Sequence, residues 1–269
     1  MLAIKNNVMA ANAARYLGQS YDALAKSVER LSSGLRIASA KDDAAGMAVR
    51  ELMRADIAVL QQGSRNALDG ISLLQSMEGA TATIDTLLVR MKQLAEQAST
   101  GSYSSAQRVI MDNEFDQMAN EIDRIATATD FNGIKMLDNS ATVSIHFGDS
   151  SDKIDIVGSK LTKAGLTIST LAITTAASAK AALSSLDGAI STNTAAAAKF
   201  GYNMNRLEST RQVLDIQAEN LMASESRISD VDVATEMAAL TRNQVLSQAG
   251  VAMLAQANTL PQMALTLLR

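Results

Sequence analysis

The sequence predicts a mainly α-helical protein, in which long coiled-coil-like helices from both chain ends pack together and a small β-hairpin lies in the middle. Three observations indicate this fold class. The 269 residues include one Pro and only 3% aromatic residues, which favours long uninterrupted helices over a core of large rings. Four segments carry apolar residues at alternating spacings of three and four. One short stretch between them alternates apolar and polar residues.

The four helical segments carry the a/d seam of a coiled coil over residues 17–31, 77–98, 111–125 and 200–221. Arg211 interrupts the last seam. The longest seam consists of Met77, Ala80, Ile84, Leu87, Met91, Leu94 and Ala98. Four ordinary amphipathic helices in a bundle are the alternative, but sustained seams with few aromatics favour long coiled helices. Because helices lie on both sides of the β element, we expect the two termini to pair.

The middle of the chain changes character after Gly101, which ends the second helical segment, and Asn132-Gly133 is a turn signal. Alternation near 142–157 predicts a β-hairpin. Its apolar positions are Val143, Ile145, Phe147, Ile154 and Ile156. The stretch near 159–199 is rich in Ala, Ser and Thr, and this composition predicts a weakly specified, surface-exposed segment that leads into a helix.

No charged residue occurs from Asn243 to Leu268. This tail holds too many Gln, Asn, Ser and Thr residues for a lipid-facing helix, whereas a monomeric helix in water carries charges on its exposed face. We interpret the tail as a helix surrounded by copies of itself, with Leu254 and Leu267 buried in the assembly. A disordered tail and a peripheral membrane segment are the alternatives. The first twenty residues carry only Lys5 and Arg15 as charges, so both chain ends are predicted to be buried in an assembly.

Lys41, Asp42 and Asp43 stand side by side, a pattern that raises the question of an active site. Neighbouring helical residues point about 100° apart, so the two carboxylates do not readily share a substrate proton. Ser39 to Asp42 fits a capping box with Ser39 as the N-cap. Gly34 permits a bend before it, and we expect Arg36 to be an ion partner between segments or subunits.

Enzymatic, metal-binding and nucleic-acid functions are not expected. The chain has no Cys and one His, so thiolate chemistry, Cys-based zinc and multi-His sites are excluded. His146 is predicted to be a solvated residue on the outer face of the hairpin. No phosphate-binding loop occurs, and the net charge of -4 gives no reason to bind nucleic acid or an anionic membrane. We therefore expect no catalytic residue and no cofactor, and the N-terminus shows no cleavable signal peptide.

Motifs near both ends closely resemble those of bacterial flagellin, the subunit of the flagellar filament. They read SVERLSSGLRIASAKDDAAGMAV, SRNALDGISLLQSMEGA, EIDRIATATDFNGIKMLDN and ESRISDVDVATEMAALTRNQVLSQAGVAMLAQANTLPQMALTLLR. The resemblance implies a short flagellin without outer variable domains, which self-assembles for motility. It implies that residues 1–45 and 226–269 form the inner helix pair of the filament, and that residues 46–225 form the outer helical domain.

The resemblance also implies partners and assembly residues. The chain would be secreted unfolded through the type III export apparatus with an export chaperone, and would meet itself and the hook–filament junction and cap proteins, but no membrane or nucleic acid. The expected assembly residues are Leu31, Arg36, Asp42, Asp43, Leu254 and Leu267. A flagellin-like hook–filament junction protein is the alternative. A lipid-surface helical protein is disfavoured because such helices carry many Lys and Arg on their polar face, whereas the tail from Asn243 to Leu268 carries none.

Finally, the resemblance implies that Toll-like receptor 5 contacts the monomer at Arg90 and Leu94, within LLVRMKQLAEQA, and at Glu114. This chain has Lys92 and Gln93 where the family often has Arg and then Glu. Leu94 also belongs to the longest seam, so a packing role is its alternative. For Arg90 and Glu114, the alternative is a solvated or inter-subunit charge.

Overall fold

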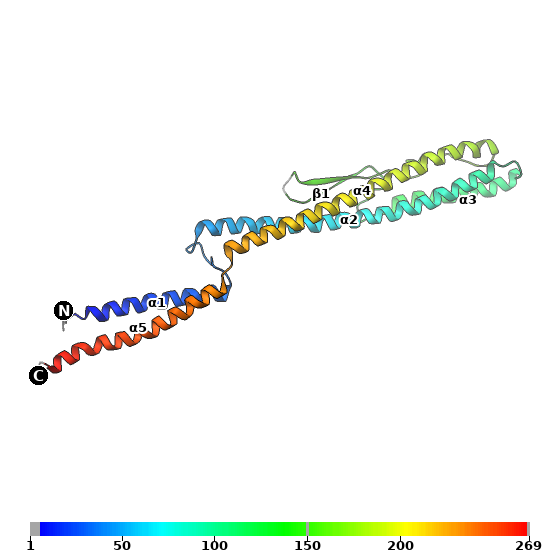
Figure 1. Cartoon of the computed structure of the whole chain (residues 1–269). Coiled ribbons are helices and arrows are strands. Elements are labelled where there is room, and N and C mark those ends of the chain that lie inside the picture. Colours follow the sequence, from blue (N-terminus) through cyan, green and yellow to red (C-terminus); the bar gives the residue numbers. More distant parts are fainter. Residues whose placement is uncertain (1–5, 149–150, 268–269) are drawn as a thin grey trace. The chain divides into compact units, whose positions relative to one another are not determined.

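The computed structural model describes residues 6–148 and 151–267, and beyond Thr259 it describes the backbone only. The elements run in the order α1 (Val8–Ser33), α2 (Ala44–Ser99), α3 (Ser105–Ala128), β1 (Thr142–His146), β2 (Lys153–Val157), α4 (Ala176–Ser229) and α5 (Val233–Leu267) (Figure 1). The predicted class, mainly α with a hairpin in mid-chain, is confirmed. The longest helix, α2, has 56 residues, as expected from a chain with a single Pro.

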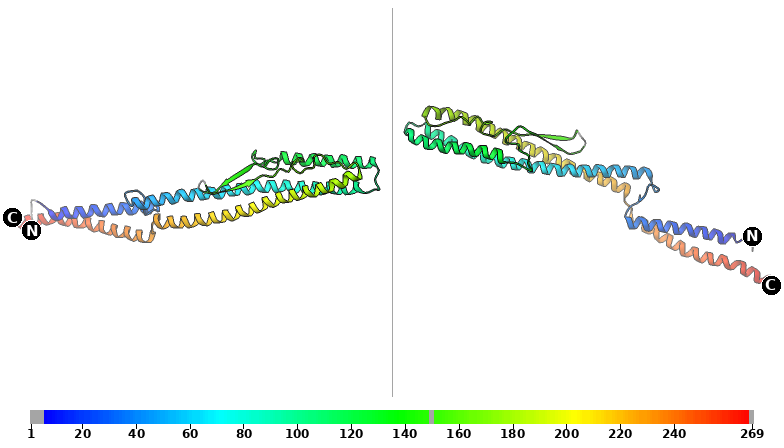
Figure 2. Two further views of the ribbon diagram at one scale, coloured as in Figure 1. Left: turned by 90° about the horizontal axis from the view of Figure 1, so that it is seen from above. Right: turned by 180° about the vertical axis from the view of Figure 1, so that it is seen from behind.

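The chain divides into two compact units. The terminal unit combines Met1–Asp56 with Asn220–Arg269 and so contains α1, α5 and the adjoining ends of α2 and α4. The central unit, Ile57–Glu219, contains the rest of α2 and α4 together with α3 and the hairpin. Figure 2 shows from two further sides that α1 and α5 stay side by side, and that α3 runs alongside α2.

The core of the central unit lies where the predicted seams of α2, α3 and α4 meet. Met77, Ile84 and Met91 of α2 are fully buried, and so are Phe115 of α3 and Phe200 of α4. These residues belong to one hydrophobic cluster with the inward side chains of the hairpin. The seams predicted from the spacing of three and four therefore form a shared core, as coiled helices do.

Helix ends in the central unit are fixed by capping. Ser104 accepts a hydrogen bond from the Gln107 N–H while the Gln107 side chain accepts one from the Ser104 N–H, so α3 begins with a capping box. The Arg108 guanidinium donates to the carbonyls of Ala98 and Thr100 at 2.8 and 2.9 Å. It thereby satisfies carbonyls at the C-terminal end of α2, which the helix itself leaves unpaired.

The hairpin forms with the predicted alternation. β1 and β2 are antiparallel, with Val143 opposite Ile156 and Ile145 opposite Ile154. The two Ile residues of β2 are buried, and His146 is exposed as predicted. A Cβ on Gly63 of α2 would lie 2.1 Å from the carbonyl oxygen of Phe147. The end of the hairpin therefore rests directly on the backbone of α2, which only Gly permits.

The prediction of a weakly specified, surface-exposed stretch near 159–199 is wrong, although it does lead into a helix: from Ala176 the chain is part of α4, and both parts of the stretch contribute buried side chains. Leu161, Leu166, Ile168 and Ile173 are buried in the shared core. Carboxylates of α3 also hold this segment, since Asp123 accepts from the Lys163 N–H at 3.1 Å and Asp112 accepts from the Ile173 N–H at 2.6 Å. A few aliphatic residues, spaced among Ala, Ser and Thr, therefore pack into the core although their segment has no regular secondary structure.

A candidate assembly surface

The terminal unit is built on an antiparallel pair of helices, α1 and α5. Asn7 caps α1 and also donates from Nδ2 to the carbonyl of Ala257 at 2.8 Å. At the other end of the pair, Arg30 lies 3.5 Å from the Glu236 carboxylate. The predicted pairing of the two chain ends is thus confirmed.

This helix pair closes no apolar core of its own. Among the described side chains of α1 and α5, only Ser27, Ser247 and Ala257 are buried. The seam of α1 is half covered, because Leu17, Leu24 and Leu31 are partly buried while Tyr21 and Val28 are exposed. Two helices are too few to enclose their apolar faces, and the rest of that surface is left open to solvent.

Large apolar side chains are exposed along both helices of the pair. On α1 they are Val8, Met9, Tyr16, Tyr21 and Val28, and on α5 they are Val233, Met237, Val245, Leu246, Val251 and Met253. Of the two expected assembly residues in the tail, Leu254 is partly buried, and the side chain of Leu267 lies outside the described residues. Scattered exposed apolar residues are ordinary, but a series along two paired helices marks an interaction surface.

A groove runs along one side of the pair. Its α1 wall consists of Ala13, Tyr16, Leu17 and Ser20, and its α5 wall of Leu246, Ala249, Gly250 and Met253. A Cβ on Gly250 would lie 3.1 Å from Cδ1 of Leu17, so the helices approach closely at this point. The lining is mostly apolar and mixes small residues with larger ones, of which Tyr16, Leu246 and Met253 are exposed, so an apolar helix face fits this groove.

Two short connections join this pair to α2 and α4. Leu35 and Asp230 form an antiparallel bridge, in which the Arg36 N–H donates to the Ser229 carbonyl at 2.7 Å and the Val231 N–H donates to the Gly34 carbonyl at 3.0 Å. The Arg36 guanidinium donates to the Ile228 carbonyl. Within the chain, Arg36 therefore binds one connection to the other through backbone carbonyls.

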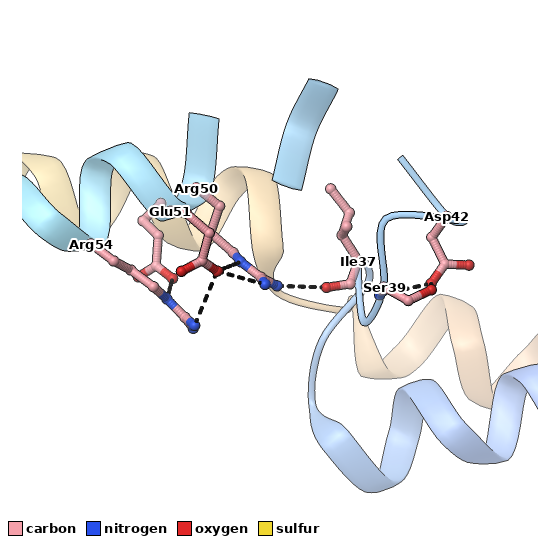
Figure 3. A network of polar contacts seen from close by, with 7 residues as sticks. Ile37, Ser39, Asp42, Arg50, Glu51 and Arg54 are labelled. Atoms are coloured by element: carbon pink, nitrogen blue, oxygen red, sulfur yellow. Dashed lines mark hydrogen bonds and ion pairs between the residues drawn. The ribbon is translucent and has the colours of Figure 1, made fainter. Parts of the chain in front are cut away.

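The connection from α1 to α2 is anchored by Arg50, which the sequence analysis missed. This side chain is only 5% exposed. Its Nη1 donates to the Ile37 carbonyl at 2.7 Å, and Glu51 accepts from its Nε and Nη2 (Figure 3). Nearby, Arg54 pairs with Glu225 at 2.7 Å. The only sequence signal was an Arg inside a largely apolar helical start, which also fits a solvent-facing residue.

Asp42 and Asp43 have different structural tasks. Asp42 accepts hydrogen bonds from Ser39 and forms an ion pair with Lys26 of α1 at 2.7 Å. The hydrogen bond from Lys26 is the main cause that lowers the pKa of Asp42 to about 2. Asp43 accepts from the Gly46 N–H at 2.9 Å and is the residue that caps α2.

The predicted helix cap at Ser39 is therefore wrong. The helix begins at Ala44, and the Ser39–Asp42 hydrogen bonds close a turn that precedes it. The two motifs are easily confused, because in both a short polar side chain accepts from a backbone N–H close by in sequence. Both carboxylates stabilise the connection between α1 and α2, so this charged stretch is mechanical.

The three residues expected at a receptor surface lie close together on the central unit, yet they differ in exposure. Arg90 of α2 and Glu114 of α3 form an ion pair at 2.9 Å, and both side chains are about half exposed. Leu94 is 2% exposed and packs in the core. Beside them, Lys92 pairs with Asp187 of α4.

The described residues hold no cluster of His, Asp or Glu that suits a metal ion. Among the helices of the described chain, none combines the length and the apolar character that crossing a membrane requires.

Comparison with known proteins gives a consistent result. Residues 4–142 match the bacterial flagellin N-terminal helical region, and residues 183–268 match the bacterial flagellin C-terminal helical region. A flagellin of Halalkalibacterium halodurans is 42% identical over 270 residues, which is 99% of each chain. The flagellar filament 33 kDa core protein of Treponema phagedenis is 41% identical, again over 99% of each chain. The crystal structure of Bacillus cereus flagellin superposes with a TM-score of 0.51 at 33% identity, covering 60% of this chain and 94% of that one.

Proposed function

The chain belongs to the bacterial flagellin family and is a structural, non-enzymatic subunit of the flagellar filament, and from this premise we propose that its terminal unit is the part that polymerises. The observation that carries this proposal is the series of exposed apolar side chains along α1 and α5. Removal of such surface from water is the main driving force of protein association. The central unit, by contrast, encloses a core of its own.

The uncharged tail supports the same proposal. No charge from Asn243 to Leu268 has to be desolvated when α5 is enclosed by other subunits. Its Gln, Asn, Ser and Thr side chains would hydrogen-bond to neighbouring copies. We propose that Leu31, Leu254 and Leu267 contribute apolar contacts in the filament. Arg36, Asp42 and Asp43 would act indirectly, by holding the connections from which the helix pair extends.

The experiment that tests this proposal is Leu254→Asp, which places an unpaired charge in the proposed interface. We expect the concentration needed for seeded polymerisation to rise by about a hundredfold or more, because burying an unpaired charge is costly. The monomer should keep its thermal unfolding transition, because the core of the central unit is untouched. Leu267→Asp should act in the same way.

The control is Leu254→Met, which keeps the volume and apolar character and should polymerise normally. Polymer is measured by sedimentation and electron microscopy, and the monomer by circular dichroism. Normal polymerisation of Leu254→Asp would show that the tail is not buried in the filament.

We propose further partners on the strength of family membership. They are the hook–filament junction and cap proteins at the ends of the filament, and the export chaperone and type III export apparatus before assembly. The absence of Cys fits passage as an unfolded chain, since no disulfide can obstruct it.

We also propose that Arg90 and Glu114 belong to a surface that Toll-like receptor 5 recognises on the monomer. This proposal is supported by the exposure of both side chains and by their direct contact across two different helices. We assign Leu94 a supporting role, because its buried side chain fixes the turn of α2 that displays Arg90.

A further inference from the structure

Two methionines of the helix pair are exposed to solvent, one in a wall of the groove between α1 and α5 and one about a helical turn beyond it. Met253 belongs to the α5 wall and is 63% exposed. Met9 is 66% exposed and lies four residues before Ala13 of the α1 wall, on the stripe that continues through Tyr16 and Ser20. Because the helices are antiparallel, with Asn7 at Ala257 and Leu17 at Gly250, the two thioethers lie toward the same end of the pair.

Other methionines of the chain are buried and serve as an internal control for access of an oxidant. Met77, Met91 and Met136 are fully buried in the central unit. Oxidation of a thioether depends on access of the oxidant, so the exposed methionines react first in the folded monomer. The chain has no Cys to consume the oxidant in their place.

We propose that Met9 and Met253 form an oxidation-sensitive site that blocks polymerisation of the monomer when it is modified by a peroxide. The sulfur attacks one peroxide oxygen, the O–O bond breaks and an S–O bond forms. The thioether is oxidised by two electrons to a sulfoxide, and hydrogen peroxide is reduced to water. This inference rests on the proposed burial of the α1–α5 pair in the filament.

Oxidation would block polymerisation because the new oxygen lies on the surface that is buried in the filament. A sulfoxide is polar and needs a hydrogen-bond donor, whereas the groove offers mostly apolar walls at this point. The modified monomer would keep its fold, because neither side chain contributes to the core of the central unit. The change is reversible, since methionine sulfoxide reductases restore the thioether with electrons from a dithiol.

The test uses purified full-length monomer and a dose of hydrogen peroxide that leaves Met77, Met91 and Met136 unmodified. Peptide mass spectrometry locates each sulfoxide, and seeded sedimentation measures polymer. We expect Met9 and Met253 to be modified early, and the concentration needed for polymerisation to rise by about tenfold or more. Circular dichroism should stay unchanged, and treatment with reductases for both sulfoxide epimers should restore polymerisation.

Variants separate this site from other exposed methionines. After the same dose, the pair Met9→Leu/Met253→Leu should lose clearly less of its polymerisation than the wild type. The control pair Met222→Leu/Met237→Leu removes two other exposed thioethers and should stay sensitive. Met237 lies about 160° around α5 from Met253, given the helical period. The pair Met9→Gln/Met253→Gln imitates the polarity of the sulfoxide and should polymerise poorly without oxidant.

Several results would overturn the inference. Undiminished polymerisation of wild-type protein with both residues fully oxidised would do so, and so would equal loss in the Met9→Leu/Met253→Leu pair. If the Met9→Leu/Met253→Leu pair fails to polymerise without oxidant, the reductase experiment on oxidised wild-type protein becomes the test. Wild-type protein that does not polymerise again after reduction of its sulfoxides would count against the site. Failure of untreated wild type to polymerise would instead contradict the proposed function.

Discussion

Asn193 of α4 donates from Nδ2 to the backbone carbonyl of Thr81 of α2 at 3.1 Å, inside the core of the central unit. The two residues are 2% and 1% exposed. Oδ1 of Asn193 has no partner among the described residues. A polar side chain at a seam position lowers stability but selects one register, because a shifted register would leave it with no partner at all.

The isosteric substitution Asn193→Asp tests this contact. The introduced carboxylate cannot donate to the Thr81 carbonyl, so we expect the free energy of unfolding at pH 7 to fall by about 3 kcal/mol. Burial should raise the pKa of the new carboxyl group in the folded state. The loss should therefore shrink at acidic pH, where the protonated group donates again, and grow as the pH rises through the raised pKa.

Chemical denaturation of the monomer at several pH values measures this effect. Asn205→Asp on the exposed side of the same helix is the control and should change stability by less than about 0.5 kcal/mol. A pH-independent loss in Asn193→Asp would contradict the hydrogen-bond explanation.

Gly63→Ala should detach the end of the hairpin from α2. The new methyl group would overlap the Phe147 carbonyl, and the resulting shift should cost about 1–3 kcal/mol of stability. Gly188→Ala is the matched control, because a Cβ there meets nothing within 4 Å. Since Ala favours a helix over Gly, the control should gain up to about 1 kcal/mol. A gain in both variants would mean that the hairpin does not need this close approach.

Periodicity was a reliable guide wherever many residues repeat one pattern. The seam from Met77 to Ala98 and the alternation from Val143 to Ile156 both form as predicted. Gly101 and Asn132-Gly133 also mark the ends and turns expected of them, and Asn132 and Gly133 have the positive φ of 51° and 78° that a tight turn needs. Such signals are local, and many residues contribute to each of them.

Features that depend on one or two residues could not be predicted in this way. The segment around Leu161 and Ile173 has no period, so nothing local showed that α3 would bind it through Asp112 and Asp123. The cap of α2 is Asp43 and not Ser39, because Asp42 closes a turn with the Ser39 N–H while Asp43 accepts from the Gly46 N–H in the first turn of the helix. The buried Arg50 donates a hydrogen bond to the backbone carbonyl of Ile37. Ile37 is too far from Arg50 in the sequence for a local pattern to indicate this contact.

Lys26→Met should raise the pKa of Asp42 from about 2 toward its ordinary value of 3.8. The pKa is lowered in the folded state, so ionised Asp42 stabilises the connection above the unfolded pKa near 4. That contribution should disappear as the pH falls from about 4 to about 2. The carboxyl carbon signal of Asp42 in an NMR titration reports the pKa. Lys41→Met is the control: it removes a charge from the exposed residue next to Asp42 and should leave the pKa of Asp42 unchanged. An equal pKa shift in both variants would mean that the net charge nearby, and not the 2.7 Å ion pair with Lys26, lowers this pKa.

Arg90→Ala should lower activation of Toll-like receptor 5 by the monomer by about tenfold or more, if Arg90 is a central contact. Stability should hardly change, because an exposed ion pair such as Arg90–Glu114 contributes only about 0–1 kcal/mol. A planar guanidinium can pair with a receptor carboxylate through two hydrogen bonds, so Arg90→Lys should recover only part of the activity. Arg124→Ala breaks another exposed pair, with Glu121 on α3, and serves as the control.

A receptor-dependent reporter assay with purified monomer measures the activity, and circular dichroism checks that the helical content is kept. Glu114→Ala should weaken activation as well, because it removes the carboxylate that positions Arg90 at 2.9 Å. The surface should be hidden in the filament, so sheared monomer should signal and intact filaments should not. Unaltered signalling by Arg90→Ala, or filaments as active as monomer, would remove Arg90 and Glu114 from the receptor surface.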